Sequence, residues 1–339
     1  MKKYNVAVIG VGAVGIEMLR VLRRRNFPVG NLRVFARSAR EIEVDGQKYS
    51  VEAISPEGFS GIDIALFAGT EGEKGAAVTY AQEAIKRGVV VIDNGVDFRM
   101  DPKVPLVVPE VNAKDVKSHH GIIANPNCST IQMVVALWPI YKKVGIKRVI
   151  VTTFQASSGA GKGAVDQLKE ENIRIASGGY QNVQVNLENK AMPQQLAYNV
   201  FPHIGGFSDD DYTTEEWKMI RETHKIMHDH KIKISATTVR VPVRTGHSEA
   251  IYLETGKSLE PEKIKEILSR APGIVVVDEP KNNLYPMPKD AEGKDEVFVG
   301  RIRKDPFVKN GLWLWVVADN LRKGAATNAI QIAECVISK

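Results

Sequence analysis

The chain has 339 residues, of which 43% are hydrophobic and 25% charged; this composition excludes a disordered protein and leaves room for two domains. Its two cysteines, Cys128 and Cys335, exclude a disulfide framework and a multi-cysteine zinc site and indicate a reducing compartment, by default the cytoplasm. The net charge of +6 comes from interleaved basic and acidic residues, which argues against a nucleic-acid partner. The sequence contains no run of about 18 apolar residues, so we expect no membrane span.

Short apolar runs alternate with helical patterns over the first third of the chain. Buried strands that alternate with helices form a mostly parallel sheet with both faces covered, so we expect a Rossmann-type doubly wound α/β domain. The expected strands are Asn5–Gly10, Leu32–Ala36, Asp63–Ala68, Val89–Asp93, Leu106–Val108 and Ile122–Ala124, and the expected helices are Ala13–Arg25 and Lys74–Arg87.

A glycine-rich turn follows the first strand. Gly10, Gly12 and Gly15 form the pattern Gly-x-Gly-x-x-Gly with Ala13 and Val14 inside it, between a strand and a helix. Such glycines permit a tight turn, close approach of a pyrophosphate and close packing of the helix. We therefore predict a dinucleotide site at these five residues.

The turn after the second strand bears on which nucleotide binds. It contains Arg37, Ser38 and Arg40 and no acid that would bond a ribose 2′-hydroxyl. Two guanidinium groups and a hydroxyl suit a 2′-phosphate, so we predict NADP(H) rather than NAD as the cofactor. The alternative is a solvated basic turn.

Cys128 lies where an apolar strand ends and an amphipathic helix begins, after the turn residues Asn125-Pro-Asn127. Unpaired N–H groups at a helix start favour a thiolate, which is the reactive form of cysteine. The alternative is a buried structural cysteine. A nucleophilic cysteine beside a nicotinamide cofactor favours aldehyde or acyl oxidoreduction through a thioester.

After Cys128 the strands become longer and alternate in polarity, which predicts a second, α+β domain with a mostly antiparallel sheet. Thr213–His228 is expected to be one of its helices, and Ala325–Ile337 is expected to be a helix that returns to the first domain. We expect the NADP-binding domain at residues 1–127 plus 320–339 and the second domain at residues 128–319. The expected strands are Arg148–Gln155, Ile232–Val243, Glu249–Glu254, Val297–Arg303 and Leu312–Ala318.

His247 is the best placed of the seven histidines to carry a proton, since it lies between two predicted strands and imidazole ordinarily titrates near neutral pH. His224 and His228 are one helical turn apart, but no third ligand is evident, so we predict no metal site.

Five motifs together resemble aspartate-β-semialdehyde dehydrogenase. The resemblance implies NADPH-dependent reduction of L-aspartyl-4-phosphate to L-aspartate 4-semialdehyde, with release of phosphate, in lysine, methionine and threonine biosynthesis. It covers nearly the whole chain, and the cysteine motif is the more specific part. The motifs are the glycine-rich start, Asn125–Gln132, Gln155–Gly161, Glu215–Lys218 and Arg240–His247.

The resemblance also implies individual roles. Cys128 would carry the thioester, His247 would act as acid and base, and Gln155 would orient the acyl group. The implied substrate contacts are Arg240 to the α-carboxylate, Glu215 to the α-amino group, and Lys218, Arg99 and Asn127 to the phosphate; Ser158, Gly159 and Asn320 are implied cofactor contacts. Residues 128–319 would be the catalytic and dimerisation domain of a homodimer or homotetramer.

Three features of the sequence bear on these implied roles. Arg240 lies seven residues before His247, an odd offset that puts them on opposite faces of an unbroken strand, so we expect a bulge or a strand end near Gly246. Asp97 lies close to Arg99, and the Gly69–Lys74 segment is more acidic than is usual in the family.

Two alternatives stay open. The first is reduction of another acyl phosphate, such as N-acetyl-glutamyl phosphate, because one methylene changes binding by only about 1–3 kcal/mol. The second is a non-catalytic NADP-binding paralogue.

Overall fold

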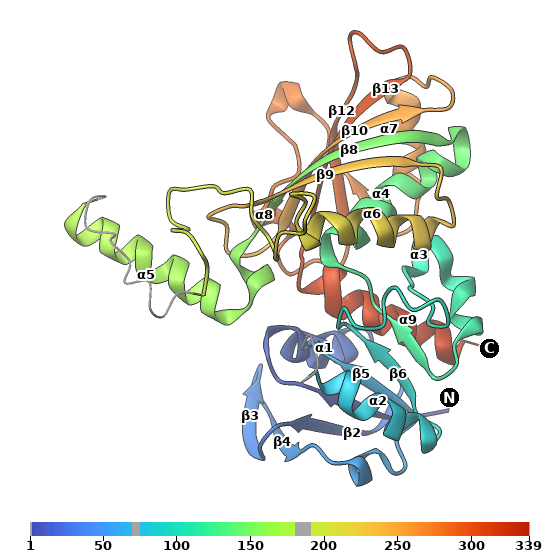
Figure 1. Ribbon diagram of the computed structural model, residues 1–339, viewed down its shortest axis with the longest axis vertical. Helices are drawn as coiled ribbons and strands as arrows, with labels where there is room; N and C mark the ends of the chain where they lie inside the picture. The colour runs from blue at the N-terminus through green and yellow to red at the C-terminus, as the bar shows by residue number, and fades with distance from the viewer. Residues whose placement is uncertain (1, 70–74, 180–190, 339) are drawn as a thin grey trace. The chain divides into compact units, whose positions relative to one another are not determined.

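The computed structural model describes residues 2–69, 75–179 and 191–338, which divide into two compact units (Figure 1). The first unit consists of Met1–Ile131, Lys225–His228 and Leu321–Lys339, and the second of Gln132–His224 and Asp229–Asn320. Within the described ranges, no helix combines the length and apolar character needed to cross a bilayer.

The first unit is built on a seven-stranded sheet of order β3-β4-β2-β1-β5-β6-β7. All neighbouring strands are parallel except β3, which is antiparallel to β4. Apart from β3, this is the strand order of a doubly wound dinucleotide-binding sheet, and it confirms the expected fold class. The strands are β1 (Tyr4–Ile9), β2 (Val29–Ala36), β3 (Arg40–Val44), β4 (Gln47–Ala53), β5 (Ile64–Phe67), β6 (Val90–Asp93) and β7 (Ile122–Ala124), and the helices are α1 (Ala13–Arg24), α2 (Ala76–Lys86), α3 (Pro109–Asn112) and α9 (Thr327–Ile337).

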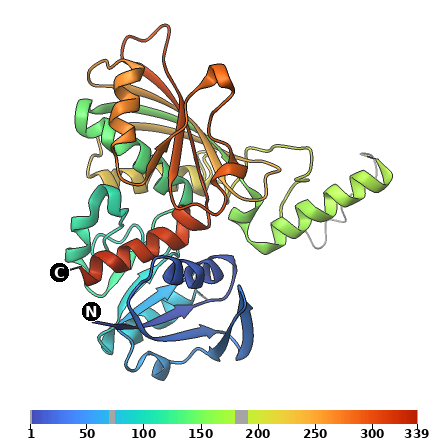
Figure 2. The same cartoon turned by 180° about the vertical axis from the view of Figure 1, so that it is seen from behind.

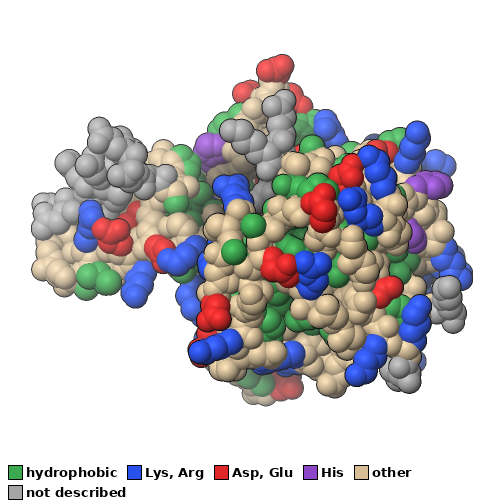
Figure 3. All heavy atoms as spheres, turned by 90° about the horizontal axis from the view of Figure 1, so that it is seen from below, with side chains coloured by type: hydrophobic (Ala, Val, Ile, Leu, Met, Phe, Trp, Pro, Cys, Tyr) green, Lys and Arg blue, Asp and Glu red, His purple; other side chains and the backbone are tan. Residues whose placement is uncertain are grey.

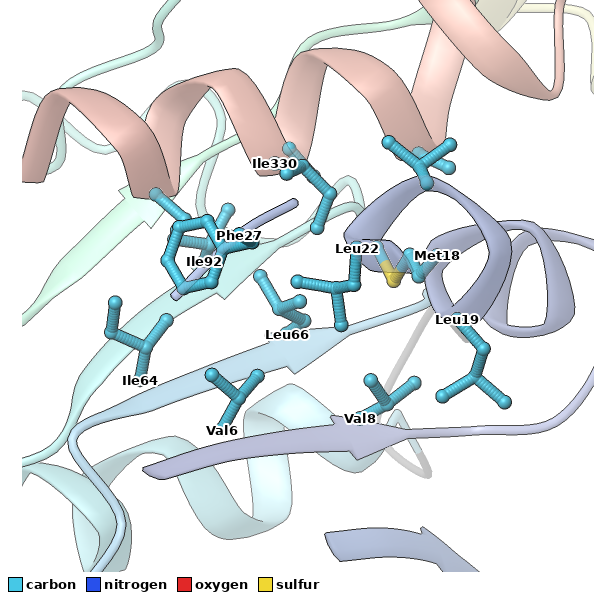
Figure 4. Close-up of a cluster of buried hydrophobic side chains, with 14 of the residues drawn as sticks. Val6, Val8, Met18, Leu19, Leu22, Phe27, Ile64, Leu66, Ile92 and Ile330 are labelled. Carbon is cyan, nitrogen blue, oxygen red and sulfur yellow. The ribbon is translucent and has the colours of Figure 1, made fainter. Parts of the chain in front are cut away.

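The core of the first unit includes side chains of the sheet, of α1 and of α9 (Figure 4). Met18, Leu19 and Leu22 fall on one face of α1, and all three are buried. Ile330 of α9 joins them, although it comes from the end of the chain. Each such side chain contributes about 1.5–3 kcal/mol through burial, so α9 is an integral part of this unit.

One expectation for the first unit is wrong, and one feature of it was not expected. Leu106–Val108 is not a strand, because Pro105 and Pro109 flank the run and Leu106 alone bridges to Ala124. Conversely, a hairpin formed by β3 and β4 was not predicted. It turns at Asp45 and Gly46, which both have positive φ, as the short-range hairpin signal Asp-Gly requires.

Charged side chains on the surface shown in Figure 3 lie interspersed. Ion pairs of the first unit join bases and acids directly, as in Arg20 with Asp45 and Arg87 with Glu83. This face therefore presents charge of both signs.

The second unit contains a six-stranded sheet of order β11-β12-β13-β10-β8-β9 (Figures 1 and 2). β10 is antiparallel to β8 and β13, and β12 is antiparallel to β13, whereas β8–β9 and β11–β12 are parallel. The sheet is therefore mixed. Its strands are β8 (Ile146–Gln155), β9 (Lys233–Arg240), β10 (His247–Thr255), β11 (Ile274–Val276), β12 (Val297–Lys304) and β13 (Gly311–Ala318), and the helices are α4 (Cys128–Val144, whose first turn belongs to the first unit), α5 (Lys162–Gly178), α6 (Thr214–Met227), α7 (Pro261–Ser269) and α8 (Pro288–Ala291).

Candidate active site

Cys128 is the first residue of α4, which confirms the predicted helix start. The side chain of Asn127 caps this helix, because its Oδ1 accepts hydrogen bonds from the N–H groups of Ser129 (3.0 Å) and Thr130 (3.2 Å). Cys128 is partly exposed, whereas Ser129 and Thr130 are fully buried. The arrangement presents a reachable sulfur at the positive end of a helix, where negative charge is favoured.

The glycine-rich turn has the geometry that a pyrophosphate site needs. Gly10 has a φ of +100°, and a Cβ on Gly15 would lie 1.8 Å from the Gly10 carbonyl oxygen, so neither position tolerates a side chain. Gly12 precedes α1 without a side-chain cap, and no described atom lies within 4 Å of the place a Cβ would occupy. Ala13 and Val14 open the helix. The residues present thus fit an anion at the N-terminus of α1.

Arg37 and Ser38 lie between β2 and β3, and Arg40 is the first residue of β3; all three are exposed. The Arg40 Nη1 group donates to Ser38 Oγ at 3.2 Å, so this hydrogen bond holds the two side chains together. Their predicted contact with a 2′-phosphate stays a prediction.

Arg99 is a buried side chain in the first unit, and its Nη2 group donates to the Asn94 carbonyl oxygen at 2.8 Å. The carboxyl of Asp93 is buried nearby and accepts the Gly95 N–H at 2.9 Å. Burial raises the pKa of Asp93 to about 6, against the opposing effects of Gly95 and Arg99, and Asp97 adds to the rise. The acidic character noted beside Arg99 therefore includes a carboxyl that titrates near neutral pH.

The backbone that follows Arg99 is held by Lys225, a residue that the sequence analysis did not single out. Lys225 Nζ donates to the carbonyl oxygens of Arg99 (2.7 Å), Asp101 (2.7 Å) and Val104 (2.8 Å). No local sequence signal announces this contact, because a lysine on a helix is ordinarily solvated.

Three predicted residues of the second unit stand in a row on one face of the sheet. Gln155 on β8 pairs with Arg240 on β9, and on the other side of β8, Phe154 pairs with Ser248, which puts Gln155 level with His247. β9 ends at Arg240 and β10 begins at His247, so the expected strand end before His247 is confirmed, whereas the expected extension of β9 to Val243 is wrong. Because β8 lies between the two strands, the odd offset no longer separates Arg240 from His247.

His247 is fully buried, and its Nδ1 atom accepts the Ala156 N–H at 3.0 Å. In a neutral ring held in this way the proton is on Nε2, which has no hydrogen-bond partner among the described residues. Burial, with a smaller effect from Arg240, lowers the pKa of His247 well below its ordinary value. The ordinary pKa of imidazole therefore does not apply to His247, because desolvation and the nearby cation both disfavour the charged ring.

Arg240 is also buried, and its Nη1 group donates to the Ala156 carbonyl oxygen at 2.5 Å. Gly159 fills the space beside both side chains. A Cβ built on Gly159 would lie 3.1 Å from His247 Nε2 and 3.2 Å from Arg240 Nη1. The main chain at Gly159 thus passes so close to His247 and Arg240 that a side chain at this position would crowd both.

Glu215 and Lys218 lie on α6, which packs over the same face of the sheet. Gln155 Nε2 donates to Glu215 Oε1 at 3.1 Å, and Lys218 Nζ lies 3.5 Å from Glu215 Oε2. Glu215 is buried, so this is more than a solvated surface pair. The cluster therefore combines one carboxylate, two cations and an amide on one face.

Ser158 and Asn320 brace the backbone around this cluster. Asn320 Nδ2 donates to Ser158 Oγ at 3.0 Å, and Asn320 Oδ1 accepts the Gly246 N–H at 2.9 Å. Both side chains are buried, and their contacts with a cofactor stay a prediction.

The remaining candidates have other partners or fall outside the described ranges. His224 Nε2 is paired with the Ile232 carbonyl at 2.8 Å and His228 Nε2 with Asp115 Oδ2 at 2.7 Å. Of the acidic Gly69–Lys74 segment, residues 70–74 lie outside the described residues. The predicted site residues thus form two groups, one in each unit.

A doubly wound sheet with an open glycine turn, together with a mixed sheet that carries a buried Arg-Gln-His row, defines a two-domain NAD(P)-dependent dehydrogenase. Comparison with known proteins agrees. A family model described as the semialdehyde dehydrogenase NAD binding domain matches residues 5–119, and the semialdehyde dehydrogenase dimerisation domain matches residues 137–323.

Relatives that match over the full length of the chain identify the family more specifically. The chain is 54% identical to the aspartate-semialdehyde dehydrogenase of Aquifex aeolicus (strain VF5), over 99% of this chain and 98% of that protein. It is 44% identical, with a TM-score of 0.92 and 99% of both chains covered, to the crystal structure of aspartate semialdehyde dehydrogenase II from Vibrio cholerae complexed with ASA. It is 25% identical, with a TM-score of 0.74 and coverage of 99% and 98%, to aspartate semialdehyde dehydrogenase with NADP from Candida albicans. The chain belongs to the aspartate-semialdehyde dehydrogenase family.

Proposed function

We propose that this chain is an NADP-dependent aspartate-semialdehyde dehydrogenase that reduces L-aspartyl-4-phosphate to L-aspartate 4-semialdehyde and releases phosphate. The observation that carries the proposal is the charge pattern of the second unit, where Gln155 pairs across the strands with buried Arg240 and donates a hydrogen bond to buried Glu215. The substrate has an α-carboxylate and an α-amino group, which need a cation and an anion at fixed separation. The related V. cholerae enzyme in complex with ASA supports the same substrate class.

Each charged residue has a part in this assignment. Arg240 binds the α-carboxylate through its planar guanidinium, and Glu215 binds the α-amino group. Lys218, Arg99 and Asn127 bind the phosphate; because Asn127 Oδ1 caps α4, its contribution is through Nδ2. Gln155 orients the acyl group.

The chemistry centres on Cys128. Its sulfur attacks the acyl carbon, so that the bond to the phosphate oxygen breaks as the C–S bond of a thioester forms. When bound, the reduced nicotinamide supplies the hydride that reduces this thioester. His247 holds a proton at Nε2, since Nδ1 is occupied by the Ala156 N–H, and it serves the reacting oxygen as a hydrogen-bond donor. A neutral imidazole with a lowered pKa is suited to polarise a carbonyl in this way.

We assign the cofactor as NADP(H). Gly10, Gly12 and Gly15, with Ala13 and Val14, suit the pyrophosphate, while Arg37, Ser38 and Arg40 suit the 2′-phosphate. Ser158, Gly159 and Asn320 complete the contacts. The NADP complex of the C. albicans relative supports this choice.

We assign residues 1–127 plus 320–339 to NADP binding and residues 128–319 to catalysis and dimerisation, in a homodimer. The sheet face opposite the Arg240 row supports a self-association surface, because it carries the aromatic pairs Phe154–Trp315 and Tyr252–Trp313. Trp315 and Trp313 are partly exposed, as expected for residues that a second copy covers. Cys128 and Cys335 form no disulfide, which suits the cytoplasm.

The test is phosphate-dependent NADP reduction with aspartate semialdehyde, compared with N-acetylglutamate semialdehyde. We expect turnover of the aspartate compound at least about 100-fold more efficiently, since the N-acetyl group removes the charge that Glu215 recognises. Glu215→Gln should narrow this preference. Equal turnover of the two aldehydes would favour the broader acyl-phosphate reductase, and no turnover of either by the wild type would favour a non-catalytic paralogue.

A further inference from the structure

A second polar row lies directly behind Arg240, Gln155 and His247 on the same face of the sheet. Glu249 on β10 pairs with Thr153 on β8, and Thr153 pairs with Thr238 on β9. All three side chains have no exposed surface. The proposed reaction does not use this row, yet Glu249 is an ionisable group two residues from His247.

Gln132 connects this row to the helix that carries Cys128. It lies one turn beyond Cys128 on α4, so both side chains are on the same side of that helix. Gln132 is fully buried, and its Nε2 group donates a long hydrogen bond of 3.4 Å to the His247 carbonyl oxygen. The Gln132 side chain also lowers the pKa of the Glu249 carboxyl, against the larger opposing effect of burial. Gln132 therefore contacts β10 at its first residue, and its amide influences the carboxyl of the third residue, which lies on the same face of the strand.

Among the described residues, no charged side chain contributes to the pKa shift of Glu249. Across the strands it faces Thr153 and Val316, and from α4 it faces Gln132. Its carboxyl oxygens make no well-formed hydrogen bond to the described residues, and burial raises its pKa well above the ordinary value, with Gln132 offsetting only part of the rise. Burial therefore favours the protonated carboxylic acid, which can donate a hydrogen bond where a carboxylate cannot.

We propose that Gln132 and Glu249 form a positioning pair. The pair fixes the first three residues of β10, and with them the ring of His247, against α4 at a point one helical turn beyond Cys128. The pair acts through His247 and does not touch the substrate. The inference rests on the proposed function only for its effect on turnover, because the placement of His247 is measurable by itself.

The test compares three substitutions in the full-length protein. Glu249→Gln keeps an uncharged hydrogen-bonding group of the same shape, Glu249→Leu removes it, and Ile251→Val is the control, since Ile251 is buried on the same strand and face. Glu249→Leu leaves the buried Gln132 amide without this neighbour, which costs stability, so its folding is checked by circular dichroism before the kinetics. We expect Glu249→Leu to lower kcat about 10-fold or more with little change in KM, as a small misplacement does. Glu249→Gln should retain kcat and its pH profile, and Ile251→Val should match wild type.

A second measurement separates positioning from turnover. The imidazole NMR resonances of His247 are assigned by the signals that His247→Asn removes. They should move in Glu249→Leu and stay in place in Glu249→Gln. If Glu249→Leu does not fold, Gln132→Met, which keeps the volume and removes the amide, should give the same shift. Wild-type kcat and resonances in either apolar variant, or a displaced pH profile in Glu249→Gln, would overturn the proposal. Absence of wild-type activity on aspartate semialdehyde would instead remove the proposed function, and the resonances would still decide the role of the pair.

Discussion

Arg240 and His247 are held by the backbone of a single residue: the Ala156 carbonyl accepts from Arg240 Nη1 at 2.5 Å, and the Ala156 N–H donates to His247 Nδ1 at 3.0 Å. The guanidinium and the imidazole are thus oriented together by the residue that follows β8. One consequence is electrostatic, since Arg240 adds to the burial that lowers the pKa of His247. The imidazole is consequently neutral at neutral pH and presents its Nε2 proton beside Gly159.

The contact at Gly159 gives the first prediction. Gly159→Ala places a methyl group 3.1 Å from His247 Nε2 and 3.2 Å from Arg240 Nη1, so one of these side chains must shift. We expect kcat/KM for aspartate semialdehyde to fall about 100-fold, because small displacements of reacting groups are costly. Steady-state kinetics check this. Gly206→Ala, at a position where a Cβ meets nothing within 4 Å, is the matched control and should retain activity.

Lys225 gives a prediction about the phosphate. Lys225→Met removes the donor shared by three carbonyl oxygens after Arg99, so this backbone segment should loosen. We expect the KM for phosphate to rise about 10-fold while the KM for aspartate semialdehyde changes little, since each lost hydrogen bond to a charged group is worth about 1.5–3 kcal/mol. The exposed Lys103, in the same segment, supplies the control Lys103→Met. Equal phosphate KM values in the two variants would contradict the role assigned to Lys225.

The raised pKa of Asp93 leads us to predict that the free energy of unfolding depends on pH. Its pKa is about 6 in the folded protein and 3.8 as an ordinary aspartate, so the folded state binds the proton more tightly. Stability from this group is present below about pH 4 and is lost as the pH rises through 6, by about 3 kcal/mol in all. Asp93→Asn should abolish this slope, so the difference in unfolding free energy between wild type and variant should change by that amount. Urea unfolding from pH 4 to 7.5 measures it, and a constant difference across this range would refute the assignment.

The cofactor assignment predicts a selective effect at the turn after β2. In Arg37→Leu/Arg40→Leu the two cations assigned to the 2′-phosphate are lost, so the KM for NADP should rise at least about 10-fold. NAD lacks that phosphate, and its KM should be unchanged, which makes it the internal control. Parallel losses with both cofactors would mean that these arginines do not read the 2′-phosphate.

Local patterns predicted much of the fold and the placement of single residues. The alternation of strands with helices, the glycine turn and the helix start at Cys128 depend on neighbours in the sequence, and the structure has all three. The turn of the β3–β4 hairpin is also encoded locally, by the dipeptide Asp45-Gly46, although we did not predict it. The strand expected at Leu106–Val108 failed because two prolines remove backbone donors around it.

Non-local features could not be read in the same way. The relation between Arg240 and His247 depends on the order β10-β8-β9, which places Gln155 between them. The pKa of His247 depends on complete burial by residues distant in sequence, and Lys225 contacts a segment more than a hundred residues earlier. Such relations follow from tertiary packing, which single-sequence patterns do not contain.

The central claim is that Cys128 carries a thioester, and its most direct test omits phosphate. When enzyme is mixed with aspartate semialdehyde and NADP alone, oxidation should stop at the acyl-enzyme, because no phosphate is present to release the acyl group. We predict a burst of one NADPH per subunit, an aspartyl adduct on the Cys128 peptide in the mass spectrum, and neither in Cys128→Ser. A burst that persists in Cys128→Ser, or an adduct on another residue, would contradict the account.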